Sequence, residues 1–237
     1  MAAPIKAAWF DFMGTCLDWH SSIVTALPSA LSETEKSTFA LEWRQAYFDA
    51  NTKCLAEGRP VEDFDDTQRR VLDDFLDRTA NLDIKHLFSP EVKDRLVAAW
   101  HHQTAWPDVS EALRRLENDS KLELYVHANG STRLQLDLVK SAGLHYDMLF
   151  SSELLGVYKP APESYQAAMK LLKLKPVECV MVAAHASDLK GAKAVGMKTV
   201  YVYRWTDDIR EDQEAVRRAN DAYLSDMHGL DRVIASL

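Results

Sequence analysis

Charged and small polar side chains follow several short apolar segments of this chain. Asp11 follows the run AAWF, Asn129 follows LELYVHA, and Asp188 comes shortly after CVMVA. An aspartate that ends a buried segment is rarely buried without a partner, and its carboxylate can act as a nucleophile or a metal ligand. The structural alternative is that Asp11 turns the chain together with Gly14 at the end of a strand.

Other candidates occupy comparable positions, and each also has an ordinary structural explanation. Lys159 would neutralise a carboxylate, or else lie solvated on the surface. Ser131 follows Gly130 and fits a helix N-cap. His185 fits a satisfied loop histidine, and Asp188 fits the N-cap of the helix beginning DLKGAKAVG.

A parallel sheet would bring these residues together. Several short segments are continuously apolar or β-branched, which is typical of strands buried on both faces of a parallel sheet. The predicted strands are Ala7–Phe12, Leu122–His127, Met148–Ser151, Cys179–Ala183 and Thr199–Tyr203. The predicted helices between them are Ser131–Ala142, Pro162–Leu172 and Asp188–Val195. Strands alternating with helices predict an open α/β sheet, whose ligands bind at the carboxyl ends of the strands.

Residues 18–103 differ because they contain no convincing strand. Their apolar residues recur at intervals of three and four, which is typical of amphipathic helices. The predicted helices are Phe39–Cys54, Gln68–Thr79 and Pro90 to about His102. We therefore predict a core domain formed by residues 1–17 and 104–237, and a helical cap domain over residues 18–103.

The composition limits the class of protein and its partners. The chain has 237 residues, of which 47% are hydrophobic and 27% charged, as in globular proteins and unlike disordered or collagen-like chains. Its net charge of −8 argues against nucleic acid or an anionic membrane as the partner. Three cysteines do not suggest a disulfide framework. Without a recognisable signal peptide or transmembrane stretch, the expected location is cytoplasmic.

Four segments resemble the motifs of the haloacid dehalogenase superfamily, in their order and spacing. They are DFMGT at Asp11–Thr15, NGS at Asn129–Ser131, GVYKP at Gly156–Pro160 and DLKGAKAVGM at Asp188–Met197. LEWRQ at Leu41–Gln45 resembles the Trp-Arg-Gln motif of the L-2-haloacid dehalogenases (type II), and Tyr165 also has a counterpart there. The resemblance implies a Rossmann-like open parallel sheet with an inserted helical cap.

Met13 helps to choose the branch of the superfamily. The phosphatases of the superfamily have a second aspartate at this position, which protonates the leaving group and helps to hold magnesium. Methionine cannot donate a proton. Magnesium prefers oxygen ligands, and Lys159 could neutralise Asp11 and Asp188 instead. The resemblance therefore implies a metal-independent hydrolase without a cofactor.

The resemblance also implies covalent catalysis by Asp11. Asp11 would attack C2 of a short 2-haloalkanoic acid, displace halide with inversion, and form an ester that water hydrolyses. Thr15 and Lys159 would orient Asp11 and keep it ionised, and Asp188 would position or activate the water. A cap that excludes water would favour attack by the carboxylate.

The remaining residues implied by the resemblance would bind substrate and halide. Arg44 from the cap would receive the departing halide, with help from Asn129. The substrate carboxylate would bind backbone N–H groups near Thr15 and those of Asn129, Gly130 and Ser131. Tyr165 would pack behind these substrate-binding residues and hold them in position. Without the resemblance, Arg44 would be interpreted as a surface arginine on an amphipathic helix.

His185 marks a departure from the family. The bacterial dehalogenases generally have Ser-Ser-Asn where this chain has Ala183-Ala184-His185, and Ser-Asn-Gly where it has Ala128-Asn129-Gly130. His185 is a candidate general base.

This departure supports an alternative, an epoxide hydrolase that opens a small epoxy acid by the same ester route. His185 or Tyr165 would then assist the ring oxygen. A phosphatase, disfavoured by Met13, and a non-catalytic binding protein are further alternatives. The expected partners are a small carboxylic acid and water, and the family often forms homodimers.

Overall fold

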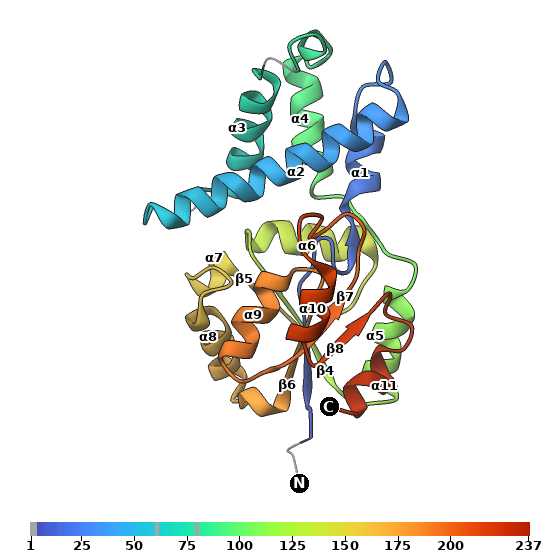
Figure 1. Cartoon of the computed structure of the whole chain (residues 1–237), viewed down its shortest axis with the longest axis vertical. Coiled ribbons are helices and arrows are strands. Elements are labelled where there is room, and N and C mark those ends of the chain that lie inside the picture. Colours follow the sequence, from blue (N-terminus) through green and yellow to red (C-terminus); the bar gives the residue numbers. More distant parts are fainter. Residues whose placement is uncertain (1–3, 60–61, 79–80) are drawn as a thin grey trace. The chain divides into compact units, whose positions relative to one another are not determined.

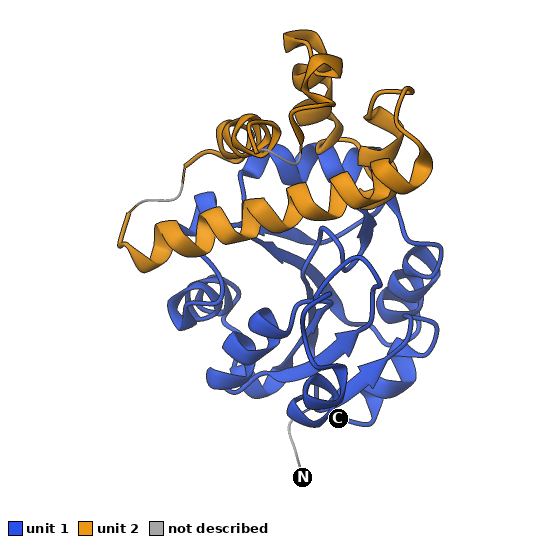
Figure 2. Cartoon of the chain, turned by 45° about the horizontal axis from the view of Figure 1, so that its top comes forward, with its two compact units in different colours: residues 1–18, 104–237 blue, residues 19–103 orange. Residues whose placement is uncertain are grey.

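The computed structural model describes residues 4–59, 62–78 and 81–237. The chain divides into two compact units, which Figure 2 shows in different colours. Unit 1 comprises the chain up to Asp18 together with Thr104–Leu237, and unit 2 comprises Trp19–Gln103. Unit 2 is therefore a continuous insertion between two parts of unit 1.

A six-stranded parallel sheet forms the centre of unit 1, with the strand order β5-β4-β1-β6-β7-β8. Its strands are β1 (Ala7–Phe10), β4 (Glu123–Ala128), β5 (Met148–Ser151), β6 (Cys179–Ala183), β7 (Lys198–Val202) and β8 (Ala222–Leu224). A separate antiparallel pair consists of β2 (Leu17–Asp18) and β3 (Thr104–Ala105). The predicted parallel sheet is confirmed, although the sequence analysis missed β8, whose three residues are too few to show a pattern.

The register of the sheet determines which residues meet at its carboxyl edge. Phe10 of β1 lies opposite Val126 of β4 and Val182 of β6. The residues that follow these three central strands therefore emerge at the same edge of the sheet. As a result, Asp11 shares this edge with the loops that begin after Ala128 and Ala183.

Helices cover both faces of this sheet, with α8 and α9 on one side and α5 and α11 on the other (Figure 1). The helices of unit 1 are α5 (Val109–Asn118), α6 (Thr132–Ala142), α7 (Ser152–Leu155), α8 (Pro162–Leu172), α9 (Ala186–Ala194), α10 (Gln213–Ala219) and α11 (Leu230–Ala235), with the 3-10 turn η3 (Pro176–Glu178). Helix α9 begins at Ala186, two residues before the predicted start at Asp188, and His185 is its N-cap. Asp188 therefore lies in the first turn of α9, and its interpretation as the N-cap is wrong.

The core between the sheet and helices α8 and α9 is rich in aromatic side chains. The ring of Trp9 on β1 stacks on Phe150, with ring centroids 5.5 Å apart, and tilts against Tyr125 at 5.1 Å. Large rings of this kind contribute much of the apolar burial in a core. This packing fixes β1, and hence Asp11, relative to α8 and α9.

All regular secondary structure in the described residues of unit 2 is helical. Its helices are α1 (Trp19–Ala26), α2 (Glu33–Ala56), α3 (Phe64–Leu76), α4 (Pro90–Ala99) and the 3-10 turn η2 (Lys85–Leu87). Helix α2 begins before the predicted range because Ser32 and Glu35 form a capping box. The predicted end of the second helix, Thr79, lies outside the described residues. Among the described residues of the chain, no helix is both long and apolar enough to cross a membrane.

Candidate active site

The carboxylate of Asp11 lies at the centre of a polar cluster in unit 1. Its Oδ1 accepts a hydrogen bond from Nζ of Lys159 at 2.9 Å, and its Oδ2 accepts one from the Thr15 hydroxyl at 2.7 Å. Nδ1 of His185 lies 3.0 Å from the same Oδ2. Asp11 is only 7% exposed, and these partners compensate for the loss of water around a buried charge.

Lys159 contacts two carboxylates, because its Nζ bonds Oδ2 of Asp188 as well as Oδ1 of Asp11. Burial alone would raise the pKa of Asp11, but the charges of Lys159 and His185 outweigh burial and hold that pKa well below its ordinary value. Burial dominates at Asp188 and raises its pKa. The two carboxylates are therefore unequal: Asp11 is held ionised, whereas Asp188 takes up a proton more readily.

Asn129 holds the backbone of Lys159. Its Oδ1 accepts the N–H of Lys159 at 2.8 Å, and its Nδ2 donates to the carbonyl of Lys159 at 3.0 Å. The amide thus links the end of β4 to the loop that carries the lysine. The predicted contact of Asn129 with the departing halide stays a prediction.

Gly130 and Ser131, which follow Asn129, form hydrogen bonds to other residues of unit 1. The N–H of Gly130 donates to the hydroxyl of Ser152 at 2.9 Å. Ser131 is the N-cap of α6, where its hydroxyl accepts the N–H of Leu134 at 3.1 Å. The structural interpretation of Ser131 is confirmed, whereas substrate binding by this loop stays a prediction.

Tyr165 supports the backbone at Asp188. Its hydroxyl donates to the carbonyl of Asp188 at 2.9 Å, and its side chain is buried on α8. Gly191 permits this arrangement, because a Cβ at that position would lie 2.7 Å from the carbonyl oxygen of Pro160 and 2.8 Å from the Tyr165 ring. Close approach of α9 to these two residues explains the glycine.

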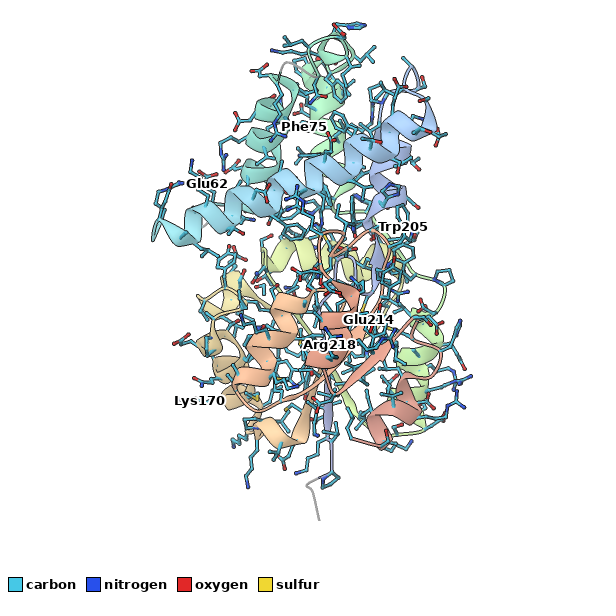
Figure 3. All side chains as sticks on the ribbon, in the orientation of Figure 1. Glu62, Phe75, Lys170, Trp205, Glu214 and Arg218 are labelled. Atoms are coloured by element: carbon cyan, nitrogen blue, oxygen red, sulfur yellow. The ribbon has the colours of Figure 1, made fainter. Side chains whose placement is uncertain are left out.

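The sequence analysis missed Asp207. Its Oδ1 lies 3.0 Å from Nε2 of His185, on the opposite side of the ring from Asp11. Asp207 lies in the loop after β7, which also carries Trp205, labelled in Figure 3. The strand that precedes this loop was predicted, but the search for polar residues at strand ends did not extend to it. Asp207 is the fifth residue after β7 and comes after the polar residues Arg204 and Thr206, so its place behind the strand does not by itself single it out.

Arg44 belongs to unit 2 and lies among aromatic rings. Its guanidinium carbon is 4.6 Å from the ring centre of Phe48, 5.2 Å from that of Trp19 and 5.4 Å from that of Trp100, as in cation–π interactions. Arg44 is buried, so its interpretation as a surface arginine is wrong. Trp43, beside Arg44, is part of the buried core. The role of Arg44 in receiving halide stays a prediction.

The residues around Asp11 also resemble a cation site. Asp11, His185 and Asp188 each offer a ligand atom, and these atoms lie within 4.8 Å of one another. However, the ammonium of Lys159 bonds both carboxylates, and a metal would require His185 to give up its contact with a carboxylate and bind as a neutral imidazole. This arrangement therefore does not fit a resident divalent cation.

Asp208, next to Asp207, gives a prediction about stability. Its Oδ2 accepts the N–H of Ala186 at 2.6 Å, and burial raises the pKa of Asp208 to about 6. In the unfolded chain an aspartate titrates near pH 3.9. Stability is therefore lost as the pH rises between about 4 and 6, because the folded protein resists ionisation of this group.

Asp208→Asn is expected to raise the free energy of unfolding by about 2 kcal/mol at pH 7 and to give no such gain at pH 4. Urea unfolding at both pH values measures the difference. Asp221→Asn is the matched control. The pKa of Asp221 is lowered, mainly by hydrogen bonds from Thr199 that outweigh burial, so that variant should lose stability at pH 7. An equal gain for Asp208→Asn at both pH values would contradict the prediction.

Comparisons with known proteins agree with the fold described above. A family model described as a haloacid dehalogenase-like hydrolase matches residues 5–196. The (S)-2-haloacid dehalogenase 4A of Burkholderia cepacia is 30% identical over 207 residues, which cover 86% of this chain and 85% of the relative.

Solved structures give the same result. The L-2-haloacid dehalogenase PA0810 superposes with a TM-score of 0.82 at 30% identity, covering 98% of this chain and 100% of that chain. A defluorinating L-2-haloacid dehalogenase also gives a TM-score of 0.82, at 27% identity and 99% coverage of both chains. The protein is a hydrolase of the α/β class. Within this class, it belongs to the haloacid dehalogenase-like hydrolases, as the motifs indicate.

Proposed function

We propose that this hydrolase is a metal-independent (S)-2-haloacid dehalogenase acting on short 2-haloalkanoic acids. The observation that carries the proposal is the buried Asp11 carboxylate, which Lys159 holds ionised at the carboxyl edge of the sheet. Met13, two residues later, has no proton to donate to a leaving group. The names of the relatives support the same substrate class.

In the first step, Oδ1 of Asp11 attacks C2 of the substrate. A bond forms between this oxygen and C2, the carbon–halogen bond breaks, and its electron pair leaves with the halide. Backside attack inverts C2 and leaves an ester on Asp11. We propose that unit 2 is the cap domain that excludes water during this step, and that Arg44, with Asn129, receives the halide.

In the second step, water attacks Cγ of the Asp11 ester and releases a 2-hydroxy acid. Asp188 is the proposed acceptor of the water proton, since Asp11 is esterified at this stage and burial raises the pKa of Asp188. The substrate carboxylate binds at the backbone near Thr15 and in Asn129–Ser131. When the substrate binds, the Gly130 N–H gives up its hydrogen bond to Ser152 and donates to the substrate carboxylate instead. Tyr165 supports Asp188 from behind.

The remaining elements of the proposal concern partners and location. Lys159 supplies the positive charge that a metal would otherwise provide, so no cofactor is required. A small carboxylic acid and water are the reactants. A homodimer and a cytoplasmic location complete the proposal, because related enzymes often dimerise and the few cysteines suit a reducing compartment.

Chloride release from racemic 2-chloropropionate, measured in the presence of a chelator, tests the proposed function. The reaction is expected to stop when half of the substrate is consumed, leaving the (R)-enantiomer. The product is expected to be (R)-lactate, because attack at C2 inverts the centre. If the folded protein releases no halide from any 2-haloacid of two to four carbons, the proposal is wrong.

One observation favours a second candidate, an epoxide hydrolase for a small epoxy acid. His185 contacts Asp11, and an imidazolium there could protonate a ring oxygen as Asp11 opens the ring. Diol formation from an epoxy acid, combined with no halide release from 2-haloacids, would support this candidate. Diol formation should then be lost in His185→Ala, and unchanged turnover in that variant would exclude His185 from this role.

A further inference from the structure

We propose that His185 is an oxyanion-hole donor for hydrolysis of the Asp11 ester, and that Asp207 is the residue that positions it. The inference rests on the ester route proposed above and deepens it. In the sequence analysis, His185 is a candidate general base. Here His185 instead donates a hydrogen bond to the oxygen on which negative charge develops. Three features of the site support this role: the contacts of both ring nitrogens, the unequal partners of the two Asp11 oxygens and the packing of Asp207.

Both nitrogens of the His185 ring face carboxylate oxygens. Nδ1 lies 3.0 Å from Oδ2 of Asp11, and Nε2 lies 3.0 Å from Oδ1 of Asp207. A carboxylate oxygen on each side of the ring favours donation by both nitrogens, which is the hydrogen-bonding pattern of an imidazolium. Burial opposes this charge, but Asp11 and Asp207 outweigh burial and raise the pKa of His185 well above its ordinary value. An imidazolium has no lone pair with which to take a proton from water.

The two oxygens of Asp11 differ in their partners. Oδ2 accepts from the Thr15 hydroxyl at 2.7 Å and from Nδ1 of His185, whereas Oδ1 accepts from Lys159 at 2.9 Å. The oxygen with two donors is the weaker nucleophile and the better site for negative charge. We therefore assign attack on carbon to Oδ1, so that Oδ2 becomes the carbonyl oxygen of the ester.

The second step then places charge on Oδ2. Water adds to Cγ of Asp11, and the carbonyl π electrons move to Oδ2, where His185 and Thr15 donate to the oxyanion. Collapse restores the carbonyl and breaks the Cγ–Oδ1 bond, so Oδ1 leaves within the 2-hydroxy acid. One proton of the water passes to Asp188 and then to the departing alkoxide, and the other leaves the new Asp11 carboxyl group for solvent. Asp11 regains its carboxylate with one oxygen from water.

Asp207 is held rigidly against this site. Its side chain has no solvent exposure, and its Oδ2 accepts the Thr206 hydroxyl at 2.7 Å. A Cβ at Gly14 would lie 2.4 Å from Oδ1 of Asp207, so Gly14, with its φ of +86°, makes room for the carboxylate. The glycine three residues after Asp11 is thus explained by the residue that orients His185.

A single-turnover experiment with (S)-2-chloropropionate tests the role of His185. His185→Ala is expected to release about one chloride per enzyme in the first turnover and then to turn over about 10²–10³-fold more slowly. Intact-mass analysis of the quenched protein should show the ester on Asp11 accumulating. The first chloride also shows that the variant is folded.

His185→Asn separates a donor from a base. Asparagine keeps an N–H donor but cannot accept a proton, so turnover is expected within about 10-fold of the wild type. Asp207→Asn should accumulate ester like His185→Ala, because the ring loses its anchor. Asp221→Asn, which removes a carboxylate bonded to Thr199, is the matched control and should leave ester hydrolysis unchanged.

Three results would overturn the inference. Equal ester accumulation in His185→Asn and His185→Ala would identify His185 as a base. Loss of the first chloride in a His185→Ala protein that unfolds in urea like the wild type would place His185 in the first step. A wild type that forms no ester and releases no halide would overturn the proposed function, and the inference with it.

Discussion

Asp11→Asn is expected to reduce chloride release from 2-chloropropionate by at least about 10⁴-fold, as when other covalent nucleophiles are removed. The amide oxygen is a poor nucleophile and carries no charge for Lys159 to stabilise. Steady-state chloride release measures the effect. Asp221→Asn, in the same unit, is the control and should keep wild-type activity. Residual activity within 10-fold of the wild type would contradict a covalent role for Asp11.

Oxygen labelling tests the same step in the wild-type protein. In a single turnover in H2(18)O, the lactate should carry no label, because its new oxygen comes from Asp11. The label should appear in the Asp11 carboxylate, where peptide mass analysis locates it. Label in the lactate of the first turnover would indicate direct attack by water and would exclude the ester route.

Lys159→Met is the second substitution with a large expected effect. It removes an ammonium that bonds both Asp11 and Asp188. The free energy of unfolding is expected to fall by about 3–5 kcal/mol at pH 7, because a buried charge loses its partner. Chloride release should also be lost, because the pKa of Asp11 rises without this cation.

A double substitution separates the two effects of this variant. Adding Asp188→Asn to Lys159→Met is expected to recover part of the stability, because one uncompensated carboxylate is gone, but no activity. Urea unfolding and chloride release measure the two. Lys6→Met is the control: Lys6 pairs with Glu178 at the surface, and its loss should change stability little. A stability loss in Lys159→Met no larger than in Lys6→Met would show that the buried ammonium is not needed.

Local patterns were enough to predict the parallel sheet and the edge that carries the site. Short apolar segments indicated the central strands, and the polar residues after them are in contact in the structure. Other features depend on contacts between distant segments. Asn129 brackets Lys159 from thirty residues away in the chain, and Asp207 reaches His185 from a loop that follows another strand.

The errors at individual residues also have physical reasons. The amphipathic pattern around Arg44 suggested an exposed face, but three aromatic rings surround the guanidinium. Asp188 was interpreted as an N-cap, although the helix begins at Ala186, directly after the extended N-cap residue His185. Two of these rings, Trp19 and Trp100, belong to segments distant from Arg44 in the sequence. Local periodicity predicts neither their contacts with Arg44 nor the start of a helix within a polar segment.

The bracket formed by Asn129 has a consequence for how this enzyme could diversify. Both ends of the amide are committed to the backbone of Lys159, and Lys159 is in turn committed to Asp11 and Asp188. A substitution at any one of these four residues removes a hydrogen-bond partner from another of them, and its destabilising effect therefore extends to the rest of the group. New substrate preferences are therefore expected to evolve at residues outside this group, while the four are inherited together.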